Sequence, residues 1–170
     1  HMNQILSDLY VRDSVTGLYN RMGYQKLSIS YFTIMREKKM PVLVMFIDLD
    51  RLKYINDTFG HEYGDFAIVS IAKAMLKHCD ADAIAARTGG DEFIVLEGAK
   101  DEESGRVLAQ KIRTELSKTQ RAMQLPFDLS ASIGAVVAHP GEENVLESYV
   151  KRAEMLMYEE KAEKKVSRDS

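Results

Sequence analysis

The chain has 170 residues, the length of one ordinary domain. It carries 23 Lys and Arg against 26 Asp and Glu, and this mild acidity argues against a protein that grips nucleic acid through its phosphates. Hydrophobic residues make up 45% of the chain and only three prolines occur, which indicates a packed core and excludes a largely disordered chain.

The single cysteine, Cys79, has no partner for an internal disulfide, so we expect a reducing, cytoplasmic setting. The longest apolar run, Val42 to Ile47, has six residues, whereas a membrane-spanning helix needs about 20. Because no signal peptide is visible either, no membrane contact is expected from this domain, although the full-length protein could be tethered to a membrane sensor. Residues 1–10 read as a vector remnant followed by the end of an upstream linker helix, and residues 11–170 as the domain.

The first half of the chain predicts a helix, a buried strand and two further helices. Asn20 is a plausible N-cap, and a helix with apolar residues at helical spacing follows it as far as the basic stretch 36–39. The continuous apolar run over 42–47 predicts a central strand buried on both faces. A short helix over 52–58 and a longer one over 65–77 come next.

The second half predicts an antiparallel hairpin and a further strand between helices. The remaining elements are strands over 83–88 and 93–96, a helix over 101–118, a strand over 127–138 and a helix over 144–165. Gly89-Gly90 indicates a two-residue turn between the hairpin strands. The order contains βαββαβ, the split-βαβ arrangement of an α+β, ferredoxin-like domain, in which the third strand lies between the first two and antiparallel to both.

Carboxylates follow the first strand and precede the third. Asp48 ends the buried run, and the predicted topology brings it next to Asp91 and Glu92, 43 and 44 positions further along. Converging carboxylates without a basic residue between them favour a hard cation, Mg²⁺ or Mn²⁺. The alternative is a turn that is rich in Asp for ordinary capping reasons. Gly89 and Gly90 likewise either make a tight hairpin or let a bulky ligand approach the backbone, and the two roles are compatible.

These residues resemble a known signature. Residues 87–93, Arg-Thr-Gly-Gly-Asp-Glu-Phe, closely resemble that of GGDEF domains, the diguanylate cyclases of bacterial signalling. Four further blocks are similar to the family in order and spacing: Asp13–Arg21, Phe46–Asp65, Ser130–Ala135 and Tyr158–Lys161. The resemblance covers roughly residues 11 to 165.

The resemblance implies an enzyme that condenses two GTP molecules into cyclic di-GMP and two pyrophosphates. The 3′-hydroxyl of each nucleotide attacks the α-phosphorus of the other, so two copies of the domain must face each other. The implied fold is the palm of nucleotide cyclases, a central antiparallel sheet flanked by helices. The implied partners are GTP, a second copy of the domain in a transient homodimer, and an upstream sensory domain; nucleic acid is not among them.

The resemblance also implies a metal site. Asp48 and the backbone carbonyl of Leu49 match two ligands, and Asp91 matches a ligand that helps to deprotonate the 3′-hydroxyl. Mg²⁺ or Mn²⁺ lowers the pKa of a bound hydroxyl and neutralises charge that develops at phosphorus. Glu92 is either a direct participant in catalysis or a residue that holds the turn.

Two residues match the pair that reads guanine in the family. Asp65 is suited to accept hydrogen bonds from N1–H and N2–H₂ of guanine, and Asn56 to bond another edge of the ring. Because adenine lacks that pair of donors, Asp65 favours GTP over ATP. The alternative for Asn56 is a helix-end turn without a role in binding.

The phosphate contacts implied by the resemblance come from two parts of the chain. Lys53 is expected to act in catalysis from the phosphate side, with the backbone N–H groups of Arg51 and Leu52 cradling the terminal phosphates at a helix start. Gly89 and Gly90 leave space for the substrate.

The last helix supplies the second set. Lys161 and Lys165 match a lysine and an arginine that contact phosphate. This chain departs from the family there, since Glu160 replaces a small residue, Lys164 a glycine and Lys165 the arginine. A lysine binds phosphate as a point charge without the bidentate fork of arginine, so the departures bear on affinity.

Two alternatives to an active cyclase are a catalytically silent GTP-binding module that regulates an attached domain, and a dimerisation module without a ligand. The altered lysines of the last helix favour the first. The joint presence of Asp48, Asn56, Asp65 and Asp91 speaks against the second.

Overall fold

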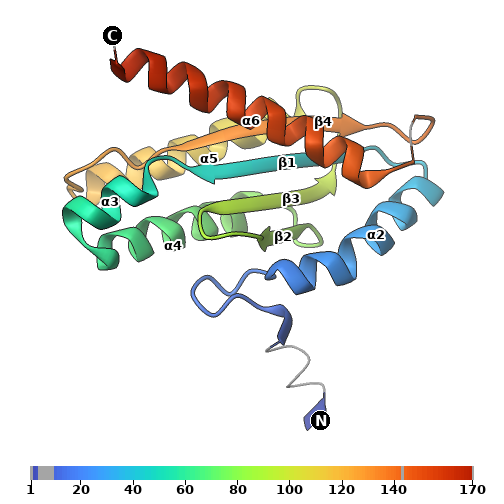
Figure 1. The fold of residues 1–170 in the computed structure, drawn as a ribbon. Helices are drawn as coiled ribbons and strands as arrows, with labels where there is room; N and C mark the ends of the chain where they lie inside the picture. Colours follow the sequence, from blue (N-terminus) through green and yellow to red (C-terminus); the bar gives the residue numbers. More distant parts are fainter. Residues whose placement is uncertain (1, 4–9, 143, 170) are drawn as a thin grey trace.

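The computed structural model describes residues 2–3, 10–142 and 144–169. A four-stranded antiparallel sheet lies between two layers of helices (Figure 1). In chain order the elements are α2 (Arg21–Glu37), β1 (Val42–Leu49), α3 (Leu52–Phe59), α4 (His61–His78), β2 (Ile84–Arg87), β3 (Glu92–Gly98), α5 (Ser104–Ala122), β4 (Ala131–Ala138) and α6 (Leu146–Asp169). The α+β class predicted from the sequence is confirmed; residues 4–9, most of the predicted linker helix, lie outside the described residues.

The strand order is β2-β3-β1-β4, so the third strand lies between the first two, as predicted. All eight residues of β1 are buried, because helices cover both faces of this central strand. The α4 and α5 helices pack with Ile55 of α3 on one face, and α2 and α6 pack on the other. Within the described parts of the chain, no helix is both long and apolar enough to cross a membrane.

Several predicted boundaries are wrong. The α4 helix begins at His61 and not at 65, because Gly60, with φ of 102°, turns the chain directly from α3 into α4. The last strand begins at Ala131 and not at 127. Phe127 and Leu129 are buried in the core without belonging to the sheet, which is why their alternation imitates a strand. The last two helices span Ser104–Ala122 and Leu146–Asp169, not 101–118 and 144–165.

The predicted two-residue hairpin turn is also wrong. Four residues, 88–91, separate β2 from β3, and the loop is closed by a 3.0 Å hydrogen bond from Thr88 N–H to the Glu92 carbonyl. Neither Gly89 nor Gly90 has the positive φ that the two-residue turn requires. Instead Arg87 donates a 2.8 Å hydrogen bond to the Gly90 carbonyl and so braces the loop.

Gly134 of β4 allows α6 to lie directly on the sheet. A Cβ atom at this position would meet the backbone of α6, 2.0 Å from the Ala153 carbonyl oxygen and 2.5 Å from the Met157 nitrogen. We expect Gly134→Ala to lower the free energy of unfolding by about 2 kcal/mol, because the helix has to move away. Gly141→Ala, where no atom lies within 4 Å of the added Cβ, is the control in a urea titration. Equal stability of the two variants would contradict this packing.

Candidate functional site

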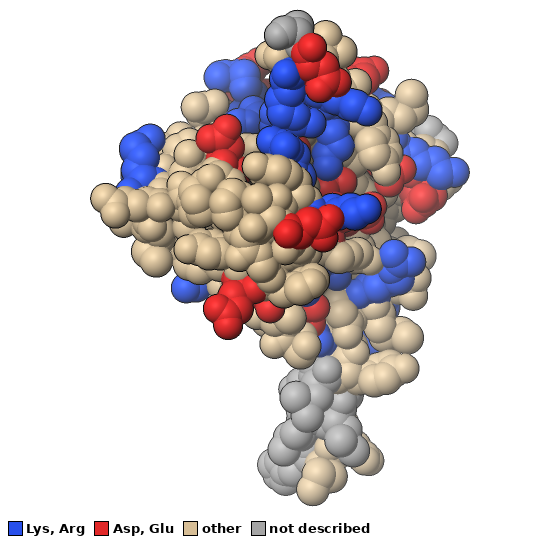
Figure 2. Space-filling model, turned by 60° about the vertical axis from the view of Figure 1, so that its left-hand side comes forward, with Lys and Arg blue, Asp and Glu red and all other residues tan. Residues whose placement is uncertain are grey.

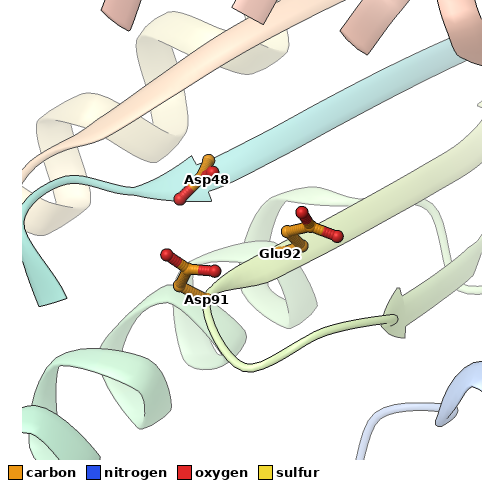
Figure 3. Close-up of side chains that lie close together, drawn as sticks. All are labelled: Asp48, Asp91 and Glu92. Carbon is orange, nitrogen blue, oxygen red and sulfur yellow. The ribbon is translucent and has the colours of Figure 1, made fainter. Parts of the chain in front are cut away.

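Three carboxylates converge where β1 ends and β3 begins (Figure 3). Asp48 is in register with Glu92 across the β1–β3 pair, and Asp91 lies in the loop just before β3. One carboxylate oxygen from each residue lies within 4.8 Å of those of the other two. The predicted convergence of these residues is therefore confirmed.

The environment of these carboxylates disfavours their negative charge. The Asp48 side chain is only 8% exposed, and its pKa is raised to about 7, chiefly by burial and also by the neighbouring Asp91. Lys161 Nζ, 3.0 Å from Asp48 Oδ1, opposes that rise and is the only donor that the described residues bring to this oxygen. Burial and the neighbouring Asp91 also raise the pKa of Glu92.

A divalent cation fits this donor set. Mg²⁺ and Mn²⁺ prefer carboxylate oxygens, and Oδ1 of Asp48 is a buried oxygen to which the described residues bring no donor except the Lys161 ammonium. The backbone at Leu49 is tied to the acidic loop, since its N–H donates a 2.9 Å hydrogen bond to the Asp91 carbonyl. Ligation by the Leu49 carbonyl stays a prediction.

A cavity of about 400 Å³ adjoins the carboxylates. Leu52, Lys53 and Asn56 of α3 line it from one side and Gly90 and Asp91 from the other, so these five predicted residues do come together. Asp57 and His61 also line the cavity, and sequence reasoning did not assign them to the site, although both belong to the matched block 46–65.

Of the two residues predicted to read guanine, Asn56 lines the cavity and Asp65 does not. Asn56 faces the start of α4, where a Cβ on Gly64 would lie 1.8 Å from its Oδ1. Asp65 follows Gly64 on α4 and is exposed, but neither it nor Gly89 is among the residues that line the cavity. The absence of a side chain at Gly64 is thus what gives Asn56 its position.

The connection from β1 to α3 presents backbone N–H groups. Arg51 has the left-handed conformation with φ of 60°, and no side chain caps the first turn of α3. The uncapped N–H groups at Leu52 and Lys53 are suited to bind an anion. The guanidinium of Arg51 lies over the Tyr54 ring, 3.9 Å from its centroid.

The predicted phosphate lysines of α6 differ from one another. Lys and Arg side chains gather over the last turns of this helix (Figure 2). Lys161 contacts Asp48, as above, whereas Lys165 is exposed. Between them, Lys164 forms a 2.7 Å ion pair with Asp50 and a 2.8 Å hydrogen bond to the Ala131 carbonyl.

Two of the three departures on α6, Glu160 and Lys164, therefore belong to one ion-pair network. Glu160 pairs with Lys164 at 3.2 Å and with Arg113 of α5 at 2.7 Å. Asp50 is buried, and hydrogen bonds from Lys164, Ser132 and Ser130 outweigh its desolvation and keep its pKa below the usual range. Sequence reasoning missed this network, because nothing local links Asp50 to a lysine 114 positions away.

The comparisons with known proteins agree with this architecture. The sequence model of the family described as "Diguanylate cyclase, GGDEF domain" matches residues 10–167. The chain belongs to the GGDEF domain family.

Particular relatives show how far the likeness reaches. The chain is 34% identical over 153 residues to diguanylate cyclase VdcA of Vibrio cholerae serotype O1, an alignment covering 88% of this chain and 43% of VdcA. It is 31% identical over 160 residues to the bifunctional diguanylate cyclase/cyclic di-GMP phosphodiesterase MucR of Pseudomonas aeruginosa, covering 94% of this chain and 23% of MucR. The chain thus spans less than half the length of these relatives.

A solved structure is similar over most of both chains. It is a microbial GGDEF domain described in an interaction with bis-(3′,5′)-cyclic di-GMP, with a TM-score of 0.74 and 27% sequence identity. The match covers 90% of this chain and 94% of that one.

Cation binding at the acidic cluster is expected to strengthen from pH 6 to pH 8, because protons compete for oxygens of Asp48, whose pKa is raised to about 7. In the metal-free protein the folded state holds that proton more tightly than the unfolded chain does. The contribution of Asp48 to the free energy of unfolding therefore falls as the pH rises from 3.8 towards 7. The Tm gain on adding Mn²⁺ should be larger at pH 8 than at pH 6; equal gains would contradict this.

Proposed function

We propose that the domain is one half-site of a diguanylate cyclase that makes cyclic di-GMP and pyrophosphate from GTP. The convergence of Asp48, Asp91 and Glu92 beside the cavity that Asn56 and Lys53 line carries this proposal. Nucleotidyl transfer requires ligands for a metal ion, donors for the phosphates and a group that recognises the base. The carboxylates, the N–H groups at the start of α3 and Asn56 are suited to these three tasks. The curated relatives named diguanylate cyclases support the same reaction.

The roles follow from the chemistry of each group. Asp48 and Asp91, with the Leu49 carbonyl, would hold Mg²⁺ or Mn²⁺, which acidifies the 3′-hydroxyl and neutralises charge at phosphorus when bound. Glu92 supports the same cluster from β3. Asn56 and Asp65 would select guanine, with Asp65 accepting hydrogen bonds from its N1–H and N2–H₂.

The phosphate chain would lie between the start of α3 and the α6 helix. The backbone N–H groups of Arg51 and Leu52 and the ammonium of Lys53 would bind it from one side, and Lys161 and Lys165 from the other. Gly89 and Gly90 would let the substrate approach the loop beside Asp91, although a Cβ at Gly89 would already lie 3.0 Å from Oε2 of Glu92. A Cβ at Gly90 would have no atom within 4 Å, so the room is there for a substrate.

A working site needs two copies of the domain. One cavity of about 400 Å³ adjoins one acidic cluster, which is room for one nucleotide, whereas the reaction joins two. We therefore propose that the domain works as a transient homodimer. We also propose that it acts in the cytoplasm and that an upstream sensory domain regulates it through the segment before Asp13. Formation of the dimer makes the rate rise more steeply than linearly with protein concentration.

One observation favours a silent GTP-binding module as the second candidate. The ammonium of Lys164 is committed to Asp50, and that of Lys161 lies at Asp48, so neither faces a free phosphate site in this structure. Nucleotide binding without turnover distinguishes this candidate from the cyclase.

The test is incubation of the protein with GTP and Mg²⁺ at increasing protein concentration, with products identified by mass spectrometry. The cyclase proposal predicts cyclic di-GMP, two pyrophosphates per product and no comparable product from ATP. GTP binding with no cyclic di-GMP at the highest protein concentration would overturn it in favour of the silent module.

A further inference from the structure

The residue that balances the charge of Asp48 is a lysine from another element. Lys161 of α6 brings its Nζ atom to 3.0 Å from Oδ1 of Asp48, next to the cluster that Asp91 and Glu92 complete. No other donor among the described residues reaches this buried oxygen. One ammonium thus contacts a member of the carboxylate cluster that is suited to hold a cation.

We propose that Lys161 is an exchangeable counter-ion of the metal site: its ammonium balances Asp48 until a divalent cation binds, and that cation displaces it toward the phosphate chain. This inference rests on the metal site of the proposed function. It adds a second role to the lysine, as a competitor of the metal before the nucleotide arrives.

The displacement follows from electrostatics. A divalent ion bound by Asp48 and Asp91 lies about 2.1 Å from its ligand oxygens. An ammonium 3.0 Å from one of those oxygens is then a close positive neighbour of the ion, and the two repel each other strongly in a half-buried site. Asp48 therefore cannot hold the divalent ion and the Lys161 ammonium at the same time at these distances.

Lys161 is free to leave, whereas the next lysine on the helix is not. The Lys161 side chain is 32% exposed, has a flexible stem and is held at Asp48 by a single 3.0 Å contact, the one ion pair that its ammonium makes among the described residues. Lys164 is held by an ion pair with Asp50, a hydrogen bond to the Ala131 carbonyl and an ion pair with Glu160. Lys164 also anchors α6 beside β1, so the release of Lys161 needs only a change of side-chain rotamer.

The exchange couples the metal to the nucleotide. Without nucleotide, Lys161 weakens metal binding, because its contact with Asp48 must be broken. With nucleotide, the released ammonium gains a phosphate partner, so metal and GTP strengthen each other's binding. Lys161 is then the group that makes the site favour the metal–nucleotide pair over the metal alone.

The test is a calorimetric titration with Mn²⁺ alone, without nucleotide, of the wild type, Lys161→Met and Lys161→Gln. Both variants should bind Mn²⁺ about two- to fivefold more tightly than the wild type, the factor expected for losing an ion pair of this exposure. The same variants should bind a non-hydrolysable GTP analogue more weakly in the presence of Mn²⁺.

The matched control is Lys164→Met, which removes a lysine one turn away that does not contact Asp48. It should not tighten Mn²⁺ binding, and its Tm should fall because Asp50 is left buried without its ion-pair partner. Unchanged or weaker Mn²⁺ binding by both Lys161 variants would overturn the proposal, as would equal tightening by Lys164→Met. The titration involves no turnover, so a protein that shows this pattern but makes no cyclic di-GMP would contradict the proposed function alone.

Discussion

Replacing Asp48 with asparagine is expected to lower the rate of cyclic di-GMP formation by roughly 10³-fold, the cost of losing a principal charged group from a transfer site. Asparagine keeps the shape of the side chain and removes the charge that a divalent cation needs. Assays with GTP and Mg²⁺, together with a Mn²⁺ titration, measure both effects. Loss of the rate should coincide with loss of metal binding.

The same substitution is expected to leave the metal-free fold intact or more stable at pH 8. The pKa of Asp48 is raised to about 7, so at that pH the ionised carboxylate is less favourable in the fold than in the unfolded chain. Asp101→Asn, at an exposed position between β3 and α5, is the control; asparagine keeps the oxygen that accepts the 2.9 Å hydrogen bond from Glu103 N–H, so neither rate nor stability should change appreciably. Asp48→Asn with wild-type turnover would contradict the role of Asp48, and global unfolding would contradict the stability argument.

Gly64→Ala is expected to weaken GTP binding about five- to tenfold, because a displaced Asn56 loses its hydrogen bond to the base and such a bond contributes roughly 1 kcal/mol. The new Cβ would lie 1.8 Å from Oδ1 and 2.8 Å from Cγ of Asn56, so this side chain must turn away from its present place. Alanine is more favourable than glycine in a helix by up to about 1 kcal/mol, which offsets part of the cost of the clash. The Tm should therefore change less than the affinity for GTP. The KM for GTP and the Tm, measured together, separate the two effects.

Glu62→Ala is the matched control, since it places alanine at an exposed position two residues away on the same helix. It should leave the KM for GTP unchanged. A Gly64→Ala variant with wild-type affinity for GTP would show that the position of Asn56 does not matter for binding. Equal losses in both variants would indicate a general effect on α4.

The sequence predicts an element well when the apolar residues of that segment alone reveal its type and burial. The apolar run over 42–47 identifies β1, and the βαββαβ order alone brings Asp48 to Asp91 and Glu92. Here local pattern and topology agree, so the acidic cluster is predictable without coordinates.

The predictions that fail depend on packing with distant residues. Phe127 and Leu129 alternate like a strand, yet they fill the core beside the sheet. The 88–91 loop looks like a glycine turn, but arginines 87 and 21 brace its carbonyl groups from outside. A side chain that arrives from another element is invisible to a local pattern.

The departures on α6 show the same limit at the functional site. From the sequence, Glu160 and Lys164 are departures expected to weaken phosphate binding. In the structure they connect α6 to Asp50 and to Arg113, and the question of phosphate affinity passes to Lys161 and Lys165. Only the three-dimensional structure shows that Lys161 and Lys164, one turn apart on α6, have different partners.

A crystal structure with a non-hydrolysable GTP analogue and Mg²⁺ tests the central claim most directly. It should show the metal held by Asp48 and Asp91, the base at Asn56 and Asp65, and Lys161 moved from Asp48 to the phosphates. A nucleotide bound elsewhere on the domain, or a metal that does not touch Asp48, would contradict the account.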